Sequence, residues 1–230
     1  MSEAIDRYLA TVLTLSDRSG GATVTRLAKE LRVAPSSVSQ MLGRLATAGL
    51  LDRLPLGLRL TAEGRKRAVF LVRRHRLSEC FLADVLGVRW HRVHEEASIF
   101  ERALSPLVVA RLAERLGHPA TCPHGSPIPD DHGDSPAAAT RPLLELAGGE
   151  AGVVACVDDI DAELLLSLES LGLVPSARLT VEKIVGDGHR LVCVEGVRQL
   201  LDQATLRHVS VGPCARRLTD KPRSPARVCA

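Results

Sequence analysis

The sequence predicts an α+β protein with three folded parts: an N-terminal winged helix-turn-helix, a block of helices and a small β-barrel. Residues 1–60 show two short amphipathic helices, a tight turn between them and a hairpin pattern, and longer amphipathic segments follow. From Pro142 the chain changes to short β-prone runs broken by Gly-Gly, Pro-Ser and Gly-Asp-Gly. We therefore predict domains at 1–63, 64–120 and 143–212, a Pro/Gly-rich loop and linker at 121–142, and a disordered tail at 213–230.

The winged helix is predicted from helical spacing and from capping residues. Residues 4–16 place apolar side chains at helical spacing, and Ser19-Gly20-Gly21 ends that segment. Thr23 can cap a second helix through VTRLAKEL, and Ala34 or Pro35 opens a third, which ends near Gly49. The run LLDRLPLGLRLT then alternates Leu with Arg, which is typical of the hairpin that forms a wing.

This first part is also the basic part of the chain. Residues 1–74 contain 13 Lys and Arg against 6 Asp and Glu, although the whole chain has a formal net charge of only +3. Such a positive lobe suggests a polyanion as partner, and an aromatic content of 2% argues against stacking on single strands. We predict that the third helix enters the major groove of double-stranded DNA, although a winged helix used only for protein contacts is the alternative. The outward residues expected to contact DNA are Pro35, Ser36, Ser37, Ser39 and Gln40, with Arg26, Arg44 and Arg59 beside them on phosphates, together with Lys29 and Arg53.

Residues 63–118 predict three helices with wide apolar stripes. The segments are AEGRKRAVFLVRRHRLSECFLADVLG, WHRVHEEASIFERAL and SPLVVARLAERLG, the last with Ser105 as cap and Pro106 in its first turn. Because the stripes are too wide for a solvated surface, we expect a homodimer. No apolar run is long enough for a membrane span and MSEAIDRYLA does not resemble a leader, so we expect a cytoplasmic protein.

The C-terminal part is predicted as a barrel-like β domain with one helix. LLELAGGEAGVVACVDD, LVPSARLTVEKIVGDGHRLVCVEG and ATLRHVSV are the β-prone runs. The helix is AELLLSLESLG, which ends at Gly172.

Five residues with metal-ligating side chains predict a metal site. His75 and Glu79 are four apart and share one helix face, and His94 lies on the next helix. Cys122 and His124 lie in a loop stiffened by prolines. Nitrogen, oxygen and sulfur donors of this kind suit divalent Fe, Mn, Co, Ni or Zn, although each motif alone is more often structural.

Two other functional classes are open at this stage. Six cysteines without a CxxC pair argue against a secreted disulfide scaffold, but Cys122 and its fellow cysteines allow a thiol-responsive winged-helix regulator. His75, Glu79 and His94 also allow a zinc hydrolase, which would leave the basic winged helix unexplained. The pairs Asp130-Asp131 and Asp158-Asp159 lie in or beside loops with no nucleophile pattern nearby. We therefore predict that the protein is not an enzyme.

The order of these motifs resembles the DtxR/MntR family of iron- and manganese-dependent transcriptional repressors. The resemblance covers residue 4 to about residue 212, most specifically in VSQMLGRLATAGLL, LRLTAEGR, RRHRLSECFLADVLG, VHEEASIFE, CPHGSPIP and VDDIDAELLLSLESLGLVPSARLTV. It implies an SH3-like (FeoA-type) C-terminal domain and a homodimer. It also implies that a divalent metal, Mn2+ or Fe2+ foremost, with Zn2+, Co2+ or Ni2+ as alternatives, orients two winged helices on a pseudo-palindromic operator to repress genes of metal homeostasis.

The resemblance assigns two metal positions, and only one of them is well matched. For the first, it implies His75, Glu79, His94, Cys122, His124 and Asp161 as ligands, while Leu164 stands where the family has a Gln. The second falls on Arg7, Ser98, Glu101 and Arg102, where two guanidinium groups cannot bind a cation. Our hypothesis is that Arg7 and Arg102 pair with Glu101, so that ion pairs replace the second metal.

Overall fold

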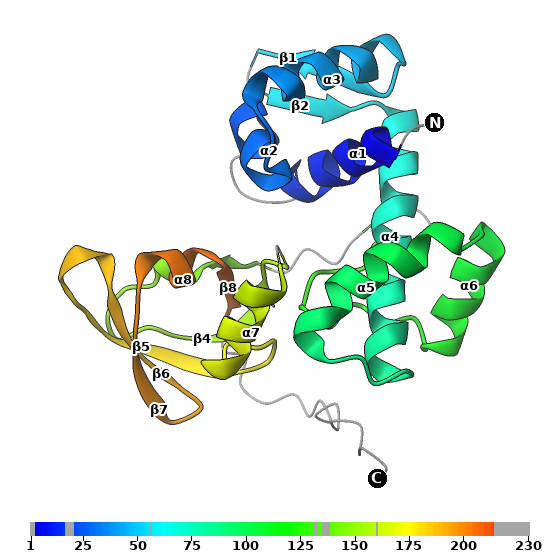
Figure 1. Ribbon diagram of the computed structural model, residues 1–230. Coiled ribbons are helices and arrows are strands. Elements are labelled where there is room, and N and C mark those ends of the chain that lie inside the picture. Colours follow the sequence, from blue (N-terminus) through cyan, green and yellow to red (C-terminus); the bar gives the residue numbers. More distant parts are fainter. Residues whose placement is uncertain are drawn as a thin grey trace. The chain divides into compact units, whose positions relative to one another are not determined.

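The chain forms two compact units in a computed structural model (Figure 1). The first comprises Met1–His75 and Pro129–Ser135, and the second comprises Arg76–Ile128 and Pro136–Ala230. Residues 3–16, 21–55, 57–130, 133–134, 139–159 and 161–213 are described here, so the predicted tail lies outside them from residue 214 onward.

The first unit contains the predicted helix-turn-helix and its wing. Its elements are α1 (Glu3–Ser16), α2 (Val24–Leu31), α3 (Pro35–Thr47), β1 (Leu51–Leu54), β2 (Gly57–Leu60) and the first part of α4 (Ala62–Asp84). Thr23 caps α2 as expected, because its hydroxyl accepts a hydrogen bond from the Arg26 amide at 3.3 Å. Gly49 has φ +69°, a left-handed conformation that favours glycine after a helix.

One apolar core joins the helices of this unit to the wing. Leu9, Leu27, Leu42 and Leu45 are fully buried in it. The wing is fastened to the loop before α2, since the Leu58 amide donates to the Ala22 carbonyl at 3.0 Å. The core therefore buries the inner face of α3 and leaves its opposite face to solvent.

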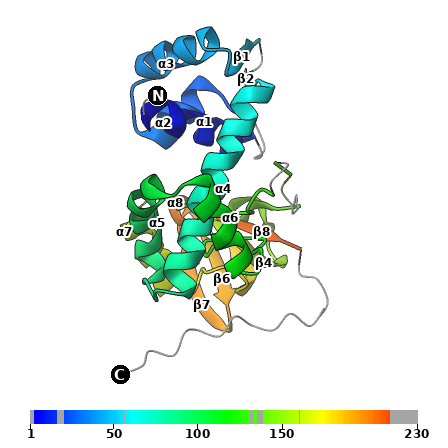
Figure 2. The same cartoon turned by 90° about the vertical axis from the view of Figure 1, so that its right-hand side faces the viewer.

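The helical part of the second unit consists of the end of α4, η1 (Trp90–Arg92), α5 (Val93–Phe100), η2 (Glu101–Ala103) and α6 (Pro106–Arg115). The single helix expected from Trp90 onward is divided into a 3-10 turn, an α-helix and a second 3-10 turn. In both views α5 and α6 lie beside the C-terminal part of α4 (Figures 1 and 2). Phe81 of α4 stacks on Phe100 of α5 with ring centroids 5.7 Å apart, and Leu82, Val93 and Ala97 are buried together there.

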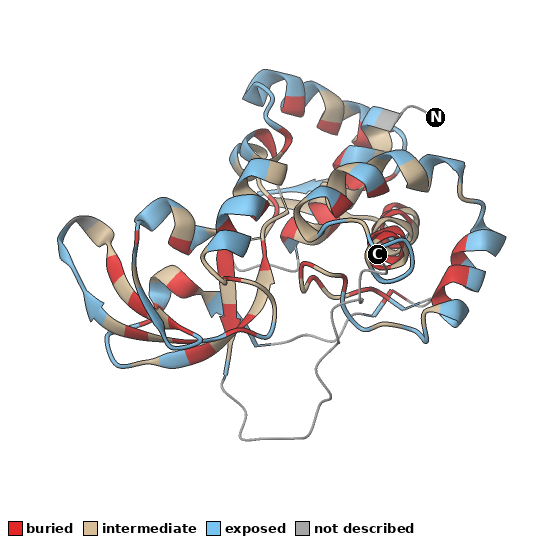
Figure 3. Ribbon diagram, turned by 60° about the horizontal axis from the view of Figure 1, so that its bottom comes forward, coloured by how far each residue is buried: buried red, intermediate tan, exposed pale blue. Residues whose placement is uncertain are grey.

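The C-terminal part is an antiparallel sheet in the order β3-β8-β4-β5-β6-β7. Its strands are β3 (Arg141–Pro142), β4 (Ala151–Val157), β5 (Arg178–Ile184), β6 (Arg190–Val194), β7 (Val197–Leu201) and β8 (Val209–Gly212). The short 3-10 turns η3 (Leu143–Glu145) and η4 (Gly186–Gly188) complete it. Buried and less buried residues alternate along β4 and β6, as Figure 3 shows by colour.

One detail of the sequence prediction was wrong in this part. The run ATLRHVSV is not one strand, because its first half lies in the helix α8 (Gln203–Arg207) and only its second half enters β8. The Asp202 carboxylate accepts a hydrogen bond from the Thr205 amide at 2.8 Å, and this cap starts the helix. The predicted helix α7 (Ala162–Ser170) is confirmed, and Gly172 follows it with φ +68°.

Within the second unit the helical part and the sheet are in contact. η1 packs against α7, and Trp90 packs against the buried cluster that includes Leu165, Leu168 and Val192. None of the described helices is both long and apolar enough to cross a membrane.

Candidate metal centre

Glu79 is the centre of the candidate site. It lies on α4 with its side chain 0% exposed, and its Oε1 is 3.1 Å from Nδ1 of His94, which α5 contributes. The same Oε1 is 3.4 Å from Nδ1 of His124, whose side chain is also 0% exposed. Two imidazoles therefore direct the same kind of nitrogen atom at one carboxylate oxygen.

Cys122 and His124 come from a tight turn after α6. The Gly125 amide donates to the Cys122 carbonyl and the Cys122 amide donates to the Ser126 carbonyl, both at 2.9 Å. Pro123, inside this turn, has a fixed φ that favours it. The turn places the Cys122 thiol, 2% exposed, and the His124 imidazole on the side of Glu79.

The turn is fastened to strand β4, and β4 leads to another carboxylate. The Val157 amide donates to the His124 carbonyl at 3.0 Å. Gly125 has φ +84°, and a Cβ atom there would overlap the Ala155 carbonyl, so only glycine lets the turn approach the strand this closely. Two residues after Val157, the half-buried Asp159 brings its Oδ2 to 3.5 Å from Nδ1 of His94.

These side chains form two overlapping groups that share Glu79. One consists of His75, Glu79, His94 and Asp159, and the other of Glu79, Cys122 and His124, with the ligand atoms of each group within 4.8 Å of one another. His75 lies one turn before Glu79 on helix α4. Separations of this size suit donors that share one cation, since Zn–N and Zn–S bonds are about 2.0–2.3 Å long.

The electrostatics are those of a site that holds positive charge. Burial by itself would lower the pKa of His94, but hydrogen bonds to Asp159 and Glu79 outweigh it and raise that pKa to about 10. The pKa of His124 is also raised, because Glu79 outweighs the opposing effect of burial. For Asp159, burial opposes ionisation, but the hydrogen bond and charge of His94 hold its pKa below the usual range.

The same surroundings keep the Cys122 thiol in its neutral form. Burial raises the pKa of its thiol well above the ordinary value, and the negative charges of Glu79 and Asp159 add to this rise. Without a cation the thiol is therefore protonated at neutral pH. A thiolate at this position needs a positive charge beside it, and a bound metal supplies one.

The donor set fits a divalent transition metal. It contains imidazole nitrogens, carboxylate oxygens and one sulfur, with most of these atoms withdrawn from water. Nδ1 of His124 is buried, and the Glu79 Oε1 atom 3.4 Å away does not meet it with the geometry of a hydrogen bond. Because a buried imidazole nitrogen rarely goes without a partner, this atom supports a ligand in the site.

Asp161 does not lie in either of these groups. It is the N-cap of α7, where its Oδ1 accepts a hydrogen bond from the Leu164 amide at 2.9 Å. The carboxylate that lies beside His94 belongs to Asp159 instead. In the sequence Asp159 belonged to a loop pair without a recognisable partner, because its position depends on the contact between β4 and the turn.

Trp90 and Gly125 were not predicted from the sequence to be near the candidate site. The Trp90 ring lies 5.0 Å from the His124 ring, and the Gly125 backbone touches β4. The motif CPHG marked a stiff turn, but nothing in it indicated which strand the turn approaches. Trp90 is the single tryptophan of the chain, and the sequence placed it only at the start of a predicted helix.

The four residues at the unmatched second position lie on α1, α5 and η2. Arg7 is exposed on α1, and Arg102, also exposed, donates through Nε to the Ser98 carbonyl at 3.0 Å. The Ser98 hydroxyl donates to the His94 carbonyl at 3.1 Å. The pairing of Arg7 and Arg102 with Glu101 therefore stays a prediction.

The residues expected to contact DNA lie on the solvent side of the first unit. Those on α3 that are exposed are Pro35, Ser36, Ser37, Ser39, Gln40 and Arg44. Arg59 is exposed on the wing and pairs with Asp52 at 3.1 Å, whereas Arg26 is half-buried and donates to the Gly21 carbonyl at 2.6 Å. Arg53 donates to the Ser39 carbonyl at 2.9 Å and so ties the wing to α3.

Three parts of the chain match domains of one protein family. Residues 1–55 match the N-terminal DNA-binding domain of the iron-dependent repressors. Residues 61–130 match their metal-binding and dimerisation domain, and residues 141–213 match the FeoA domain. Together these matches cover most of the chain. The metal-binding and dimerisation domain contains five candidate ligands, His75, Glu79, His94, Cys122 and His124. Asp159 and Asp161 lie in the FeoA domain.

Relatives of known structure and function show the same family. The iron-dependent repressor IdeR of Mycobacterium tuberculosis is 36% identical over 211 residues, which cover 84% of this chain and 90% of that protein. A manganese-dependent transcriptional repressor in complex with manganese is 32% identical, with a TM-score of 0.81 over 91% of this chain and 99% of that one. ScaR with bound Zn2+ is 28% identical, with a TM-score of 0.77 over the same shares. This chain belongs to the iron-dependent repressor family, whose members are metal-dependent, DNA-binding transcriptional repressors and not enzymes.

Proposed function

We propose that the protein is a cytoplasmic homodimeric repressor whose binding to double-stranded DNA depends on a divalent metal held by His75, Glu79, His94, Cys122, His124 and Asp159. The observation that carries this proposal is the convergence on Glu79 of donors from α5, the turn after α6 and the loop after β4. A cation bound there joins segments that are far apart in the sequence. Metal occupancy then changes how tightly the second unit is held together.

The metal is manganese or iron, with zinc, cobalt or nickel as alternatives. The names of the relatives support this choice, since they include an iron-dependent repressor and a repressor in complex with manganese. ScaR has been described with both Zn2+ and Cd2+ bound. The donors accept several divalent ions, so cellular availability contributes to the choice as much as affinity does.

The DNA contacts are made by α3 and the wing. Short polar side chains at Ser36, Ser37, Ser39 and Gln40 suit base edges in the major groove, where Gln pairs with adenine. Arg44 and Arg59 are exposed beside them and suit phosphates. Two such units in a dimer would bind the two halves of a pseudo-palindromic operator.

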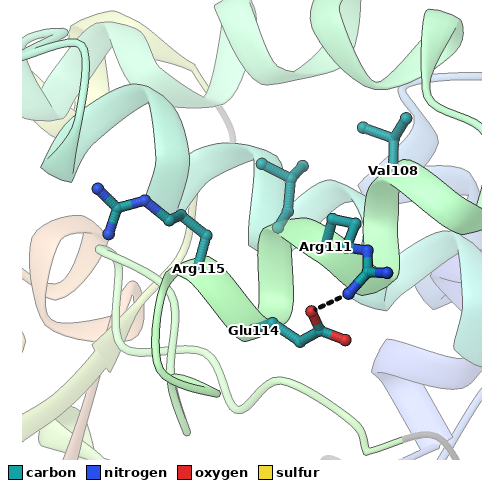
Figure 4. Close-up of a pocket in the computed structure, with 5 residues that line it drawn as sticks. Val108, Arg111, Glu114 and Arg115 are labelled. Carbon is teal, nitrogen blue, oxygen red and sulfur yellow. Dashed lines mark hydrogen bonds and ion pairs between the residues drawn. The ribbon is translucent and has the colours of Figure 1, made fainter.

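An exposed apolar strip on α6 supports dimerisation. Leu107 is 68% exposed and its neighbour Val108 is 41% exposed. Beside them lies a shallow hollow lined by Val108, Leu112 and Arg115, with Arg111 and Glu114 paired at 2.7 Å on its rim (Figure 4). A second copy of the chain would remove this strip from water.

The second position does not hold a metal in this proposal. Arg7 and Arg102 cannot act as ligands, and we infer that they pair with Glu101 instead. The protein therefore responds to metal through the site around Glu79 alone.

The thiol-responsive alternative is disfavoured by the surroundings of Cys122. Its thiol is buried and its pKa is raised, whereas redox-sensing cysteines are exposed and have lowered pKa values. The relatives are also named for metals and not for oxidants.

Substitution of Cys122 tests the proposal. We expect Cys122→Ser to lower metal affinity and to abolish metal-dependent operator binding, because the hydroxyl is a much poorer ligand than a thiolate. Cys193→Ser, on strand β6 outside both metal-ligating groups, is the matched control and should behave like the parent. Metal content of the purified proteins and a DNA-shift titration with Mn2+, Fe2+ and Zn2+ provide the measurements. Parent-like metal affinity in Cys122→Ser, or operator binding that ignores a chelator in the parent, would contradict the proposal.

A further inference from the structure

Trp90 touches the metal-ligating turn at two points. Its indole Nε1–H donates to the Pro123 carbonyl at 2.9 Å, and its own carbonyl lies 3.1 Å from Nε2 of His124. Its ring also packs against the imidazole, with the ring planes tilted by 59°. One residue therefore holds the backbone of the turn and the side chain of the ligand that the turn carries.

The contact with the Trp90 carbonyl decides which nitrogen of His124 is available to a metal. A carbonyl oxygen can only accept a hydrogen bond, so Nε2 of His124 must carry the proton. Nδ1, which faces Glu79 at 3.4 Å, is then the nitrogen that gives up its proton to a metal. In metal sites the other ring nitrogen commonly donates to such an acceptor, which fixes the orientation of the ring.

Trp90 also lies against the SH3-like domain. It is half-buried and packs on the core of that domain, while the helix α7 packs on η1. The adjacent residue His91 places its Nδ1 at 2.8 Å from the Glu169 carboxylate of α7. The three residues of η1 therefore lie between the domain, the turn and α5, which begins at Val93 and carries His94.

We propose that Trp90 is a positioning residue for the metal site: it orients His124 and ties metal ligation to the docking of the SH3-like domain. This rests on the proposed function and adds to it the route by which the domain is coupled to the metal. The indole N–H holds the turn by its hydrogen bond to the Pro123 carbonyl. The Trp90 carbonyl determines the tautomer of His124, and the indole ring packs against the core of the SH3-like domain. Metal binding at Nδ1 of His124 therefore stabilises the docking of the SH3-like domain through Trp90.

The test compares Trp90→Phe with Glu169→Gln. Trp90→Phe keeps an aromatic ring but loses the donor to Pro123, so the turn is no longer held in one orientation. We expect Co2+ affinity to fall by about 10- to 100-fold, the range found when partners of metal ligands are removed. The intensity of thiolate-to-cobalt absorption should fall as well. Glu169→Gln alters the contact between α7 and His91 but leaves Trp90 and the turn in place, so its Co2+ affinity should match the parent.

The parent protein gives an independent measurement, because Trp90 is its single tryptophan. Saturating Zn2+ should change the Trp90 emission of the parent. It should also lower the rate of amide hydrogen exchange in α7 of the parent, but not in α7 of Trp90→Phe. The proposal is overturned if Trp90→Phe binds Co2+ as tightly as the parent, or if Trp90→Phe and Glu169→Gln lose Co2+ affinity to the same extent. It is also overturned if saturating Zn2+ leaves the Trp90 emission of the parent unchanged. If the parent binds no metal at all, the proposed function itself has failed. Thermal unfolding of the variants separates loss of affinity from loss of the fold, and the emission measurement needs no variant.

Discussion

Glu79 is a fully buried carboxylate whose Oε1 atom faces two imidazoles. A buried ionised group is costly unless it is paired, and here two imidazoles reach the same carboxylate oxygen. In the absence of a metal, protons on His94 and His124 supply the positive charge that Glu79 and Asp159 require. A metal replaces those protons, so protonation and metal binding compete for the same atoms.

This competition predicts that metal binding releases protons. In the metal-free protein the pKa of His94 is raised to about 10 and that of Cys122 is also raised, so both are protonated at neutral pH. Binding requires a neutral imidazole and a thiolate, whereas Asp159 is already ionised because its pKa is lowered. Metal affinity should therefore rise with pH from neutrality up to the His94 pKa of about 10.

Calorimetry can count the protons. Titrations with Mn2+ or Zn2+ in two buffers of different ionisation enthalpy should show release of at least one proton for each metal bound. Cys122→Ser should release fewer protons than the parent, since its hydroxyl does not ionise. A parent protein that releases none, with an affinity that does not change with pH, would contradict this assignment.

At the scale of elements, the segment between β4 and α7 gives two nearby aspartates different surroundings. Asp159 follows the strand and faces His94, whereas Asp161 begins the helix and accepts from the Leu164 amide. The strand itself is held by the His124 carbonyl, and the neighbouring Asp158 amide donates to the His208 carbonyl at 2.9 Å. Backbone contacts on both sides therefore fix the direction of the Asp159 side chain.

This difference predicts opposite outcomes for two alanine substitutions. Asp159→Ala removes a carboxylate from the metal-ligating group and should lower metal affinity. Asp161→Ala removes a helix cap, which should lower the free energy of unfolding by about 1 kcal/mol while metal affinity stays close to that of the parent. Metal titrations and chemical unfolding of both variants in chelator distinguish the roles. Loss of metal affinity in Asp161→Ala alone would restore Asp161 as the ligand.

At the scale of the whole molecule, the metal site closes long loops of chain. Within the second unit, Glu79, His94, Cys122 and Asp159 come from four separate segments, and a cation would link all of them. Occupancy of the site is thus a property of the folded chain and not of a short motif.

Metal addition should therefore stabilise the native protein by mass action. A ligand that binds the folded state alone contributes about 2.7 kcal/mol when its free concentration is about 100 times its dissociation constant. Thermal unfolding with and without Mn2+ or Zn2+ should show a higher Tm with metal, and Cys122→Ser should show a smaller rise. An unchanged Tm in the parent at saturating metal would show that the donors are not gathered in the native state.

The sequence by itself predicted most of the elements and most members of the candidate site. Helical spacing, the Thr23 and Ser105 caps, and the glycines after α3 and α7 depend on neighbours within a few residues, so local patterns predicted them. The same holds for His75 and Glu79, which one turn of helix brings to a common face. The run ATLRHVSV was predicted incorrectly because a single cap at Asp202 outweighed its strand propensity.

Only the tertiary structure decided which side chains meet. Asp159 and Gly125 reach the site through contacts between the turn after α6 and strand β4, segments that lie about thirty residues apart in the chain. Trp90 reaches it through its hydrogen bond to the Pro123 carbonyl. A local pattern carries no information about such a contact, because the free energy that favours it comes from packing the SH3-like core and η1 together. Choosing between Asp159 and Asp161 therefore required the position of a backbone, which spacing alone does not supply.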